Sequence, residues 1–175
     1  MTGLTWTRGY SLAELERAQA LFGLTFPPDL IDLLRDRRPV DGPDWNDENT
    51  IRSLLAWPFE GLLFGVEENG LWWLEWGGRP DRAEERAEVL RGVVGRAPRL
   101  IPIFRHRCLP ATPSEAGNPV FSVYQSDVIH YGADLDDYID REENGWADRP
   151  WPETVREIDF WSELVRRNED RPVQI

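Results

Sequence analysis

Residues 118–138 constrain the fold of this 175-residue chain more than any other stretch. They contain two short strand-like runs, 119–124 and 128–131, which are built mainly from β-branched and aromatic residues. Such residues suit a half-buried pleated surface. The polar residues 125–127 between the runs have turn chemistry. Gly132 ends the second run, and an acidic helix start follows it, so the stretch predicts a β-hairpin followed by a helix.

The first third of the chain is predicted to be helical. Ser11 and Glu14 form a capping box, in which each side chain satisfies a free backbone N–H group of the first turn. Gly23 ends this helix. A second helix begins at the prolines 27–28, and a third is expected over residues 48–56.

A second hairpin, rich in Trp, is predicted after these helices. Residues 57–61 break the helical period, and residues 62–66 have the composition of a buried strand. The dipeptide Asn69-Gly70 is a strong hairpin-turn signal, after which residues 71–74 would return as the partner strand. Two adjacent tryptophans on that strand would point to opposite faces of the sheet.

The remaining elements are a long helix over residues 81–95, a strand over residues 100–104, a loop over residues 109–117 and a final helix near residues 160–167. The N-cap residues expected for the two helices are Asp81 and Asp159. Helices thus come first, then hairpins with one inserted helix, then helices again, without βαβ alternation. This order predicts an α+β fold with a central antiparallel β-sheet and helices packed against it on one side.

We expect a single domain over residues 1–175, whose acidic C-terminal segment begins at about residue 144. The formal net charge is −12, and all 20 basic residues are Arg. Such a chain should repel nucleic acid and anionic membrane surfaces, so the expected partner is a protein, and plain solubility is the alternative reason for the acidity. A single Cys excludes an internal disulfide. With no signal pattern and no apolar run of about 18 residues, the expected location is the cytoplasm.

The sequence shows little catalytic chemistry. Two His and one Cys lack the spacing of metal ligands, so neither a metal nor a cofactor is expected. Cys108, His106 and Asp127 form a nucleophile triad only on paper, because a two-residue separation along a strand gives poor hydrogen-bonding reach. A small buried Cys is the simpler interpretation. Adjacent acids such as Glu67 and Glu68 indicate a solvated face rather than the paired carboxylates of a glycosidase.

An interaction protein is therefore favoured over an enzyme. Trp, Tyr and Arg dominate the binding energy of protein interfaces, which makes the Trp-rich stretch and the polar turn at residues 125–127 the candidate binding regions. The candidate partner-binding residues are Glu67, Glu68, Trp72, Trp73, Trp76, His106, Arg107, Gln125 and Asp127.

Three stretches, taken in their order along the chain, resemble the SUKH superfamily. They are WPFEGLLFGVEENGLWWLEWG (57–77), RLIPIFRHRCLP (99–110) and GNPVFSVYQSDVIHYGADLDDYI (117–139). This is the family of bacterial immunity proteins and the yeast cell-wall synthesis regulator. The positions that match its pattern are Trp57, Pro58, Gly61, Trp73, Trp76, His106, Arg107, Pro110, Pro119, Ser122, Gln125, Asp127, Tyr131, Gly132 and Leu135. Cys108 departs from it, since relatives are expected to carry an aromatic residue there.

The resemblance implies an α+β fold without catalytic activity, in a protein that binds and neutralises a toxin. The acidic and aromatic surface would then cover the toxin's active site, and a basic nuclease is one candidate toxin. Opposite charge would speed the encounter. The alternative is an intracellular regulatory scaffold that binds a host protein or small ligand in a cleft near Trp76, His106 and Asp127. The oligomeric state stays open.

Overall fold

The computed structural model describes residues 4–146 and 150–170. Its elements are β1 (Trp6–Arg8), α1 (Leu12–Phe22), α2 (Pro28–Asp36), β2 (Arg37–Pro39), α3 (Glu48–Glu68), the 3-10 turn η1 (Leu74–Trp76), α4 (Ala83–Val94), β3 (Leu100–Phe104), β4 (Arg107–Pro110), β5 (Val120–Tyr124), β6 (Asp127–Gly132), α5 (Leu135–Asn144) and α6 (Trp161–Glu169). Strands β3 to β6 form an antiparallel sheet in chain order, and β1 pairs with β2. The fold is α+β, as predicted.

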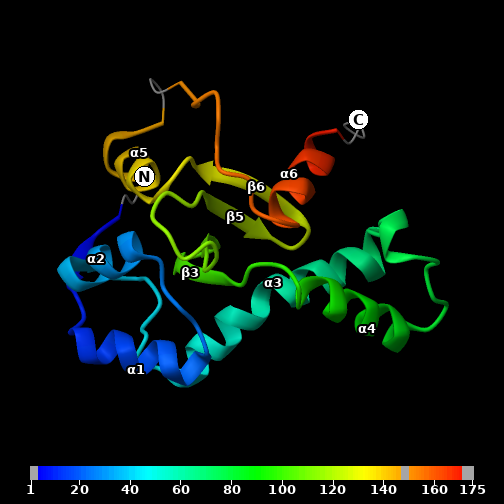
Figure 1. Ribbon diagram of the computed structural model, residues 1–175, viewed down its shortest axis with the longest axis horizontal. Coiled ribbons are helices and arrows are strands. Elements are labelled where there is room, and N and C mark those ends of the chain that lie inside the picture. Colours follow the sequence, from blue (N-terminus) through cyan, green and yellow to red (C-terminus); the bar gives the residue numbers. More distant parts are fainter. Residues whose placement is uncertain (1–3, 147–149, 171–175) are drawn as a thin grey trace.

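The N-terminal helices form where their end signals predict them. The Ser11 hydroxyl accepts a hydrogen bond from the Glu14 backbone at 3.2 Å, and the Ser11 N–H donates to the Glu14 carboxylate at 2.7 Å. Gly23 then closes α1 in the left-handed region, at φ 61°. Helices α1 and α2 lie at one end of the molecule, and α4 lies at the other (Figure 1).

The predicted Trp-rich hairpin is wrong, because α3 continues through it to Glu68. Pro58 lies inside this helix, where a proline removes a hydrogen bond and costs about 3 kcal/mol. The cost is offset by burial, since Pro58, Leu62 and Val66 form a helical stripe that packs into the core. Asn69 and Gly70 end the helix instead of turning a hairpin, with Gly70 at φ 67°.

The second half of the sheet follows the prediction more closely. Strands β5 and β6 form the expected hairpin, and the Asp134 side chain caps α5 by accepting from the Asp137 N–H at 2.8 Å. Residues 109 and 110, predicted as the start of a loop, belong to β4, which pairs with both β3 and β5. Pro110 is compatible with this because it ends the strand.

Neither Asp81 nor Asp159 caps a helix through its side chain. The N-cap residues are Arg82 for α4 and Phe160 for α6, and neither makes a side-chain cap bond. The Asp81 backbone carbonyl instead accepts a hydrogen bond from Arg86 at 2.7 Å. Just before α6, the backbone N–H of Ile158 donates to the Ser162 hydroxyl at 2.9 Å.

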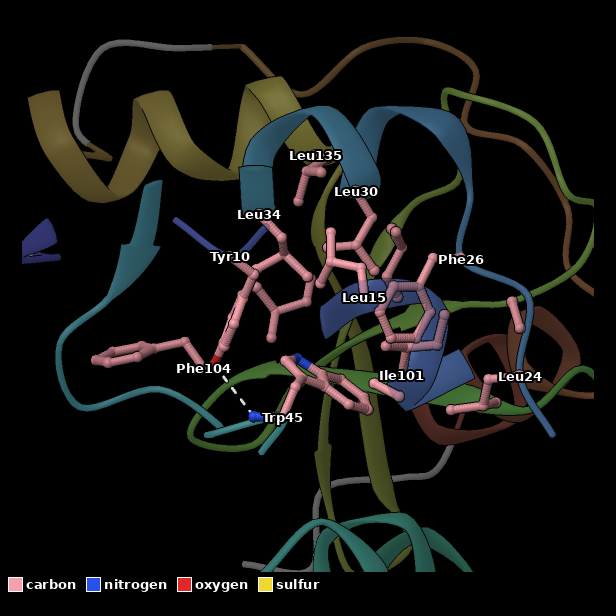
Figure 2. Packing of buried hydrophobic residues seen from close by; sticks show 14 of the residues in the cluster. Tyr10, Leu15, Leu24, Phe26, Leu30, Leu34, Trp45, Ile101, Phe104 and Leu135 are labelled. Atoms are coloured by element: carbon pink, nitrogen blue, oxygen red, sulfur yellow. Dashed lines mark hydrogen bonds between the residues drawn. The ribbon is translucent and has the colours of Figure 1, made fainter. Parts of the chain in front are cut away.

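Helices cover both faces of the sheet, rather than one as expected. Alternate strand residues enter two different clusters: Ile101, Leu109 and Val120 belong to the first, and Leu100, Cys108 and Phe121 to the second. The first cluster lies under α1, α2, α5 and the start of α3. Figure 2 shows its members gathered around Trp45, whose backbone N–H donates to the Tyr10 hydroxyl at 3.1 Å. The second cluster lies under α3, α4 and α6.

The acidic C-terminal segment takes part in the second cluster. Ile158, Trp161, Leu164 and Val165 are all buried there, and α6 packs on β6. Within residues 4–146 and 150–170, no helix has both the length and the apolar character needed to cross a bilayer.

Candidate functional site

The candidate residues separate into two groups. Glu67, Glu68, Trp72, Trp73 and Trp76 lie at the end of α3 and in the loop that follows it. His106, Arg107, Gln125 and Asp127 lie at the tips of the β3–β4 and β5–β6 hairpins. The pocket that His106 lines contains neither Trp76 nor Asp127, so this pocket is not the cleft expected between those three residues.

The three tryptophans anchor the loop between α3 and α4, residues 69–82, which we call the Trp loop. The ring of Trp73 lies 5.1 Å from that of Trp76 and 5.3 Å from that of Phe160. Trp72 packs edge-on against Trp76 at 5.4 Å, and its indole N–H donates to the Gly77 carbonyl at 2.8 Å. All three rings are half-buried. They therefore pack together and against Phe160, not on opposite faces of a strand.

An arginine from α6 closes over this aromatic cluster. The Arg167 guanidinium lies 4.1 Å above the Trp73 ring and donates to Glu75 at 2.6 Å. The hydrogen bond from Arg167 lowers the pKa of Glu75. Because Glu75 is exposed and Arg167 is about one-third exposed, solvent screens the ion pair, which itself adds little stability. The contact nevertheless ties the Trp loop to α6.

Glu67 and Glu68 have different environments. Glu67 accepts two hydrogen bonds from the Arg86 guanidinium of α4, which lower the pKa of the Glu67 carboxyl. Arg86 also donates to the Pro80 carbonyl at 3.1 Å. Glu67 is therefore placed to hold α3 and α4 together, whereas Glu68 is exposed at the end of α3.

The Trp loop also exposes a residue that the sequence did not single out. Leu74, at the start of η1, is 93% exposed although its neighbour Trp73 is packed. Phe64 on α3 is exposed by 45%. Residues 60–94, which we call the acidic arm, contain eight Asp and Glu against four Arg. The sequence analysis placed Leu74 on the predicted strand 71–74, so it gave no reason to expect a fully exposed side chain there.

A concave surface lies between α3 and the hairpins, and we call it the hairpin pocket. Its volume is about 330 Å³, and its walls come from α3, β3, β4, β5 and the turn between β3 and β4. Two aromatic side chains at the pocket, Trp57 and Tyr124, are exposed by 47% and 56%. The lining residues are Leu54, Trp57, Pro102, Arg105, His106, Cys108 and Tyr124.

Backbone packing positions α3 over the hairpins. A Cβ atom on Gly61 would lie 2.7 Å from the Cα of Gln125, so the helix rests directly on the β5–β6 turn. Trp57 precedes Gly61 by four residues and thus shares its side of the helix. Each hairpin turn has a non-Gly residue in the left-handed region, Arg105 at φ 52° and Gln125 at φ 54°, which is uncommon and mildly strained.

The β3–β4 turn is locally basic in this acidic chain. Arg107 lies 3.8 Å over the Tyr131 ring and contacts the Nε2 atom of His106. Burial, together with the positive charges of Arg107 and Arg105, lowers the pKa of His106. His106 is therefore neutral near pH 7.

Cys108 forms part of the pocket wall but is not prepared for nucleophilic chemistry. Burial raises the pKa of its thiol to about 12, so the thiolate is scarce at neutral pH. Asp127, the third residue of the hypothetical Cys108–His106–Asp127 triad, does not line the pocket. Among the described residues, no group of three or more His, Cys, Asp and Glu could hold a metal ion.

His130 is partly buried on the second face of the sheet. Its ring lies 5.0 Å from Phe121 and 6.5 Å from Trp151, and its Nε2 atom is buried without a hydrogen-bond partner among the described residues. Burial lowers the pKa of His130, although the nearby carboxylates Glu157 and Glu169 oppose this shift. The folded protein therefore favours the neutral imidazole.

We predict that the free energy of unfolding falls as the pH drops below about 6.5, the ordinary His pKa. In this range the unfolded chain binds more protons than the folded one, because folding lowers the pKa of His130, so stability rises with pH. One such group changes the slope by at most about 1.4 kcal/mol per pH unit.

Urea unfolding at several pH values between 5 and 7.5 checks this prediction. His130→Gln should flatten the dependence, and adding His106→Gln should flatten it further, because the pKa of His106 is also lowered. An unchanged slope in His130→Gln would contradict the role of this residue.

Comparisons of this chain with protein-family models, with curated proteins and with solved structures give no match.

Proposed function

We propose that this protein is a non-catalytic SUKH-like immunity protein, which neutralises a basic toxin by covering its active site. The observation that carries the proposal is the exposure of Leu74 on a loop held by packed tryptophans. An exposed apolar side chain on a rigid base can be removed from water in a complex at little ordering cost. The resemblance to the SUKH superfamily and the net charge of −12 support the same function.

The acidic arm would provide both the apolar and the electrostatic contribution to binding. Leu74 would be removed from water in the complex, and each Å² of buried apolar surface contributes about 25 cal/mol. Glu68 and Glu75 lie on either side of it in the sequence and are exposed, so they would attract a basic surface and speed association. Because the tryptophans already fix the loop, little ordering entropy would be lost on binding.

The proposal includes a cytoplasmic location and a single domain, in which the arm and the sheet act as one rigid binder. The SUKH pattern positions Trp73 and Trp76 then serve the interface indirectly, by holding Leu74 outward. The hairpin-tip residues Gln125 and Asp127 would lie outside the main contact.

The test requires the toxin itself, obtained from a gene beside this one or from affinity purification followed by mass spectrometry. We expect Leu74→Ala to weaken binding about thirtyfold, the loss typical of a hot-spot residue. Calorimetric titration measures this loss, and the association rate should fall as salt is added. Cells that produce the toxin should survive with the wild-type protein and grow less well with the variant.

Leu12→Ala is the matched control, because Leu12 on α1 is also exposed, by 46%, but lies outside the acidic arm. It should bind the toxin as the wild type does. Equal affinity of Leu74→Ala and wild type, or an acidic partner whose binding is insensitive to salt, would refute the proposal.

A further inference from the structure

The hairpin pocket has no part in the proposed toxin interface. Its volume of about 330 Å³ falls in the range of small-molecule sites, about 300–1,000 Å³. Leu54, Pro102 and Cys108 give it an apolar wall, while Arg105 and His106 bring polar groups from the β3–β4 turn. An apolar hollow with polar groups on one side is suited to bind a small amphiphilic molecule. This interpretation accounts for its lining better than a solvent-filled depression without a ligand does.

The polar side of the pocket favours an anion. No carboxylate pairs with Arg105 or Arg107 within residues 4–146 and 150–170, even though the chain has 32 acids against 20 arginines. Arg105 is exposed, and its guanidinium lies 4.9 Å from the Phe104 ring. A cation–π contact at an exposed site is weak, so the guanidinium can exchange it for a bidentate bond to a carboxylate.

The exposed side of the pocket favours an aromatic ring. The rings of His106 and Tyr124 lie edge-on, with centroids 6.1 Å apart, and the Trp57 indole lines the same pocket from α3. Aromatic pairs prefer such edge and offset arrangements over face-to-face stacking. A flat ligand ring would add contacts to these side chains and remove their exposed apolar surface from water.

We propose that the hairpin pocket binds a small aromatic carboxylate, whose ring packs between Trp57 and Tyr124 and whose carboxylate pairs with Arg105. The site is independent of the proposed toxin interface on the acidic arm. It would make the protein responsive to an aromatic acid in addition to its protein partner.

Calorimetric titration of the full chain with 2-naphthoate tests the proposal, with neutral 2-naphthamide as the paired probe. We expect saturable 1:1 binding of the acid and binding of the amide that is about tenfold weaker, because a charged hydrogen bond is lost. Amide-resonance shifts on adding the acid should concentrate at Trp57, His106 and Tyr124.

Variants separate the charge from the cavity. Arg105→Gln keeps most of the side-chain stem and should reduce acid affinity to that of the amide, with no effect on the amide itself. Trp57→Ala should weaken both probes. Arg96→Gln is the matched control, because Arg96 is also exposed but lines a different pocket, and it should bind both probes as the wild type does.

Several results would overturn the assignment. They are the absence of saturable acid binding at millimolar concentration, equal affinity for the two probes, or resonance shifts that cluster at the Trp loop instead of the hairpins. An Arg105→Gln variant that melts like the wild type and binds the acid equally well would also overturn it. None of these results bears on toxin binding, which Leu74→Ala tests separately.

Discussion

Replacing Trp161 with Ala is expected to destabilise the protein by about 3–5 kcal/mol, the usual loss for a buried Trp. Trp161 is 1% exposed on α6 and packs in the core cluster of the second sheet face. Its indole N–H donates to the Pro98 carbonyl at 2.7 Å. The variant therefore leaves a cavity and removes a hydrogen bond from a part-buried carbonyl. Since the free energy of unfolding of a whole protein is only about 5–15 kcal/mol, this variant would lose much of its stability.

Urea unfolding followed by far-UV circular dichroism measures this effect. Trp161→Phe should fall between Ala and wild type, because it retains a ring but not the N–H donor. Trp57→Ala is the matched control on an exposed Trp, 47% accessible, and it should change stability by less than about 1 kcal/mol. A Trp161→Ala loss no larger than this control would show that the acidic C-terminal segment does not hold the core.

Replacing Gly61 with Ala is expected to destabilise the protein by about 1–3 kcal/mol, the range for overpacking. Gly to Ala normally stabilises a helix interior, by roughly 0.5–1 kcal/mol. At Gly61, however, the added Cβ would meet the Gln125 Cα at 2.7 Å and its backbone N and O at 3.2 Å. These are backbone atoms that cannot rotate away, so α3 would shift off the β5–β6 turn.

Gly92→Ala provides a control of opposite sign. Gly92 is an exposed residue of α4, and the nearest atom to its added Cβ would be an Arg96 side-chain nitrogen at 3.7 Å. This variant should gain about 0.5–1 kcal/mol in unfolding free energy. If both variants stabilise the protein, the close contact between α3 and the hairpin is absent in solution.

The elements predicted correctly are those whose signals are local. The Ser11 and Glu14 capping box, the Gly23 helix end and the Asp134 cap each satisfy hydrogen bonds within a few residues of themselves. The β5–β6 hairpin likewise depends on neighbouring β-branched and aromatic residues. Such choices depend little on the rest of the fold.

The elements predicted wrongly are those where distant packing outweighs a local signal. Pro58 and the Asn69-Gly70 dipeptide argued for a break and a hairpin, yet α3 runs to Glu68 because its apolar stripe is buried against the second sheet face. Strand β4 exists because β3 and β5 lie on either side of it. No short window contains that information.

The candidate site shows the same division. The sequence placed binding residues in the Trp-rich stretch and at residues 125–127. In the structure, the tryptophans of the Trp loop pack against one another and Leu74 is exposed. The hairpin pocket is lined by Trp57, Arg105 and Tyr124, which come from separate stretches of the chain.

The sequence by itself determined the α+β class, the acidic charge and the hairpin-to-helix unit of residues 118–138, because composition and neighbouring residues decide these. Only the tertiary structure decided the length of α3, the two-sided core and the exposure of each aromatic ring. The physical reason is that solvent exposure depends on which distant surfaces meet. Here α6 and the later part of α3 close over one face of the sheet, while α1, α2, α5 and the start of α3 close over the other.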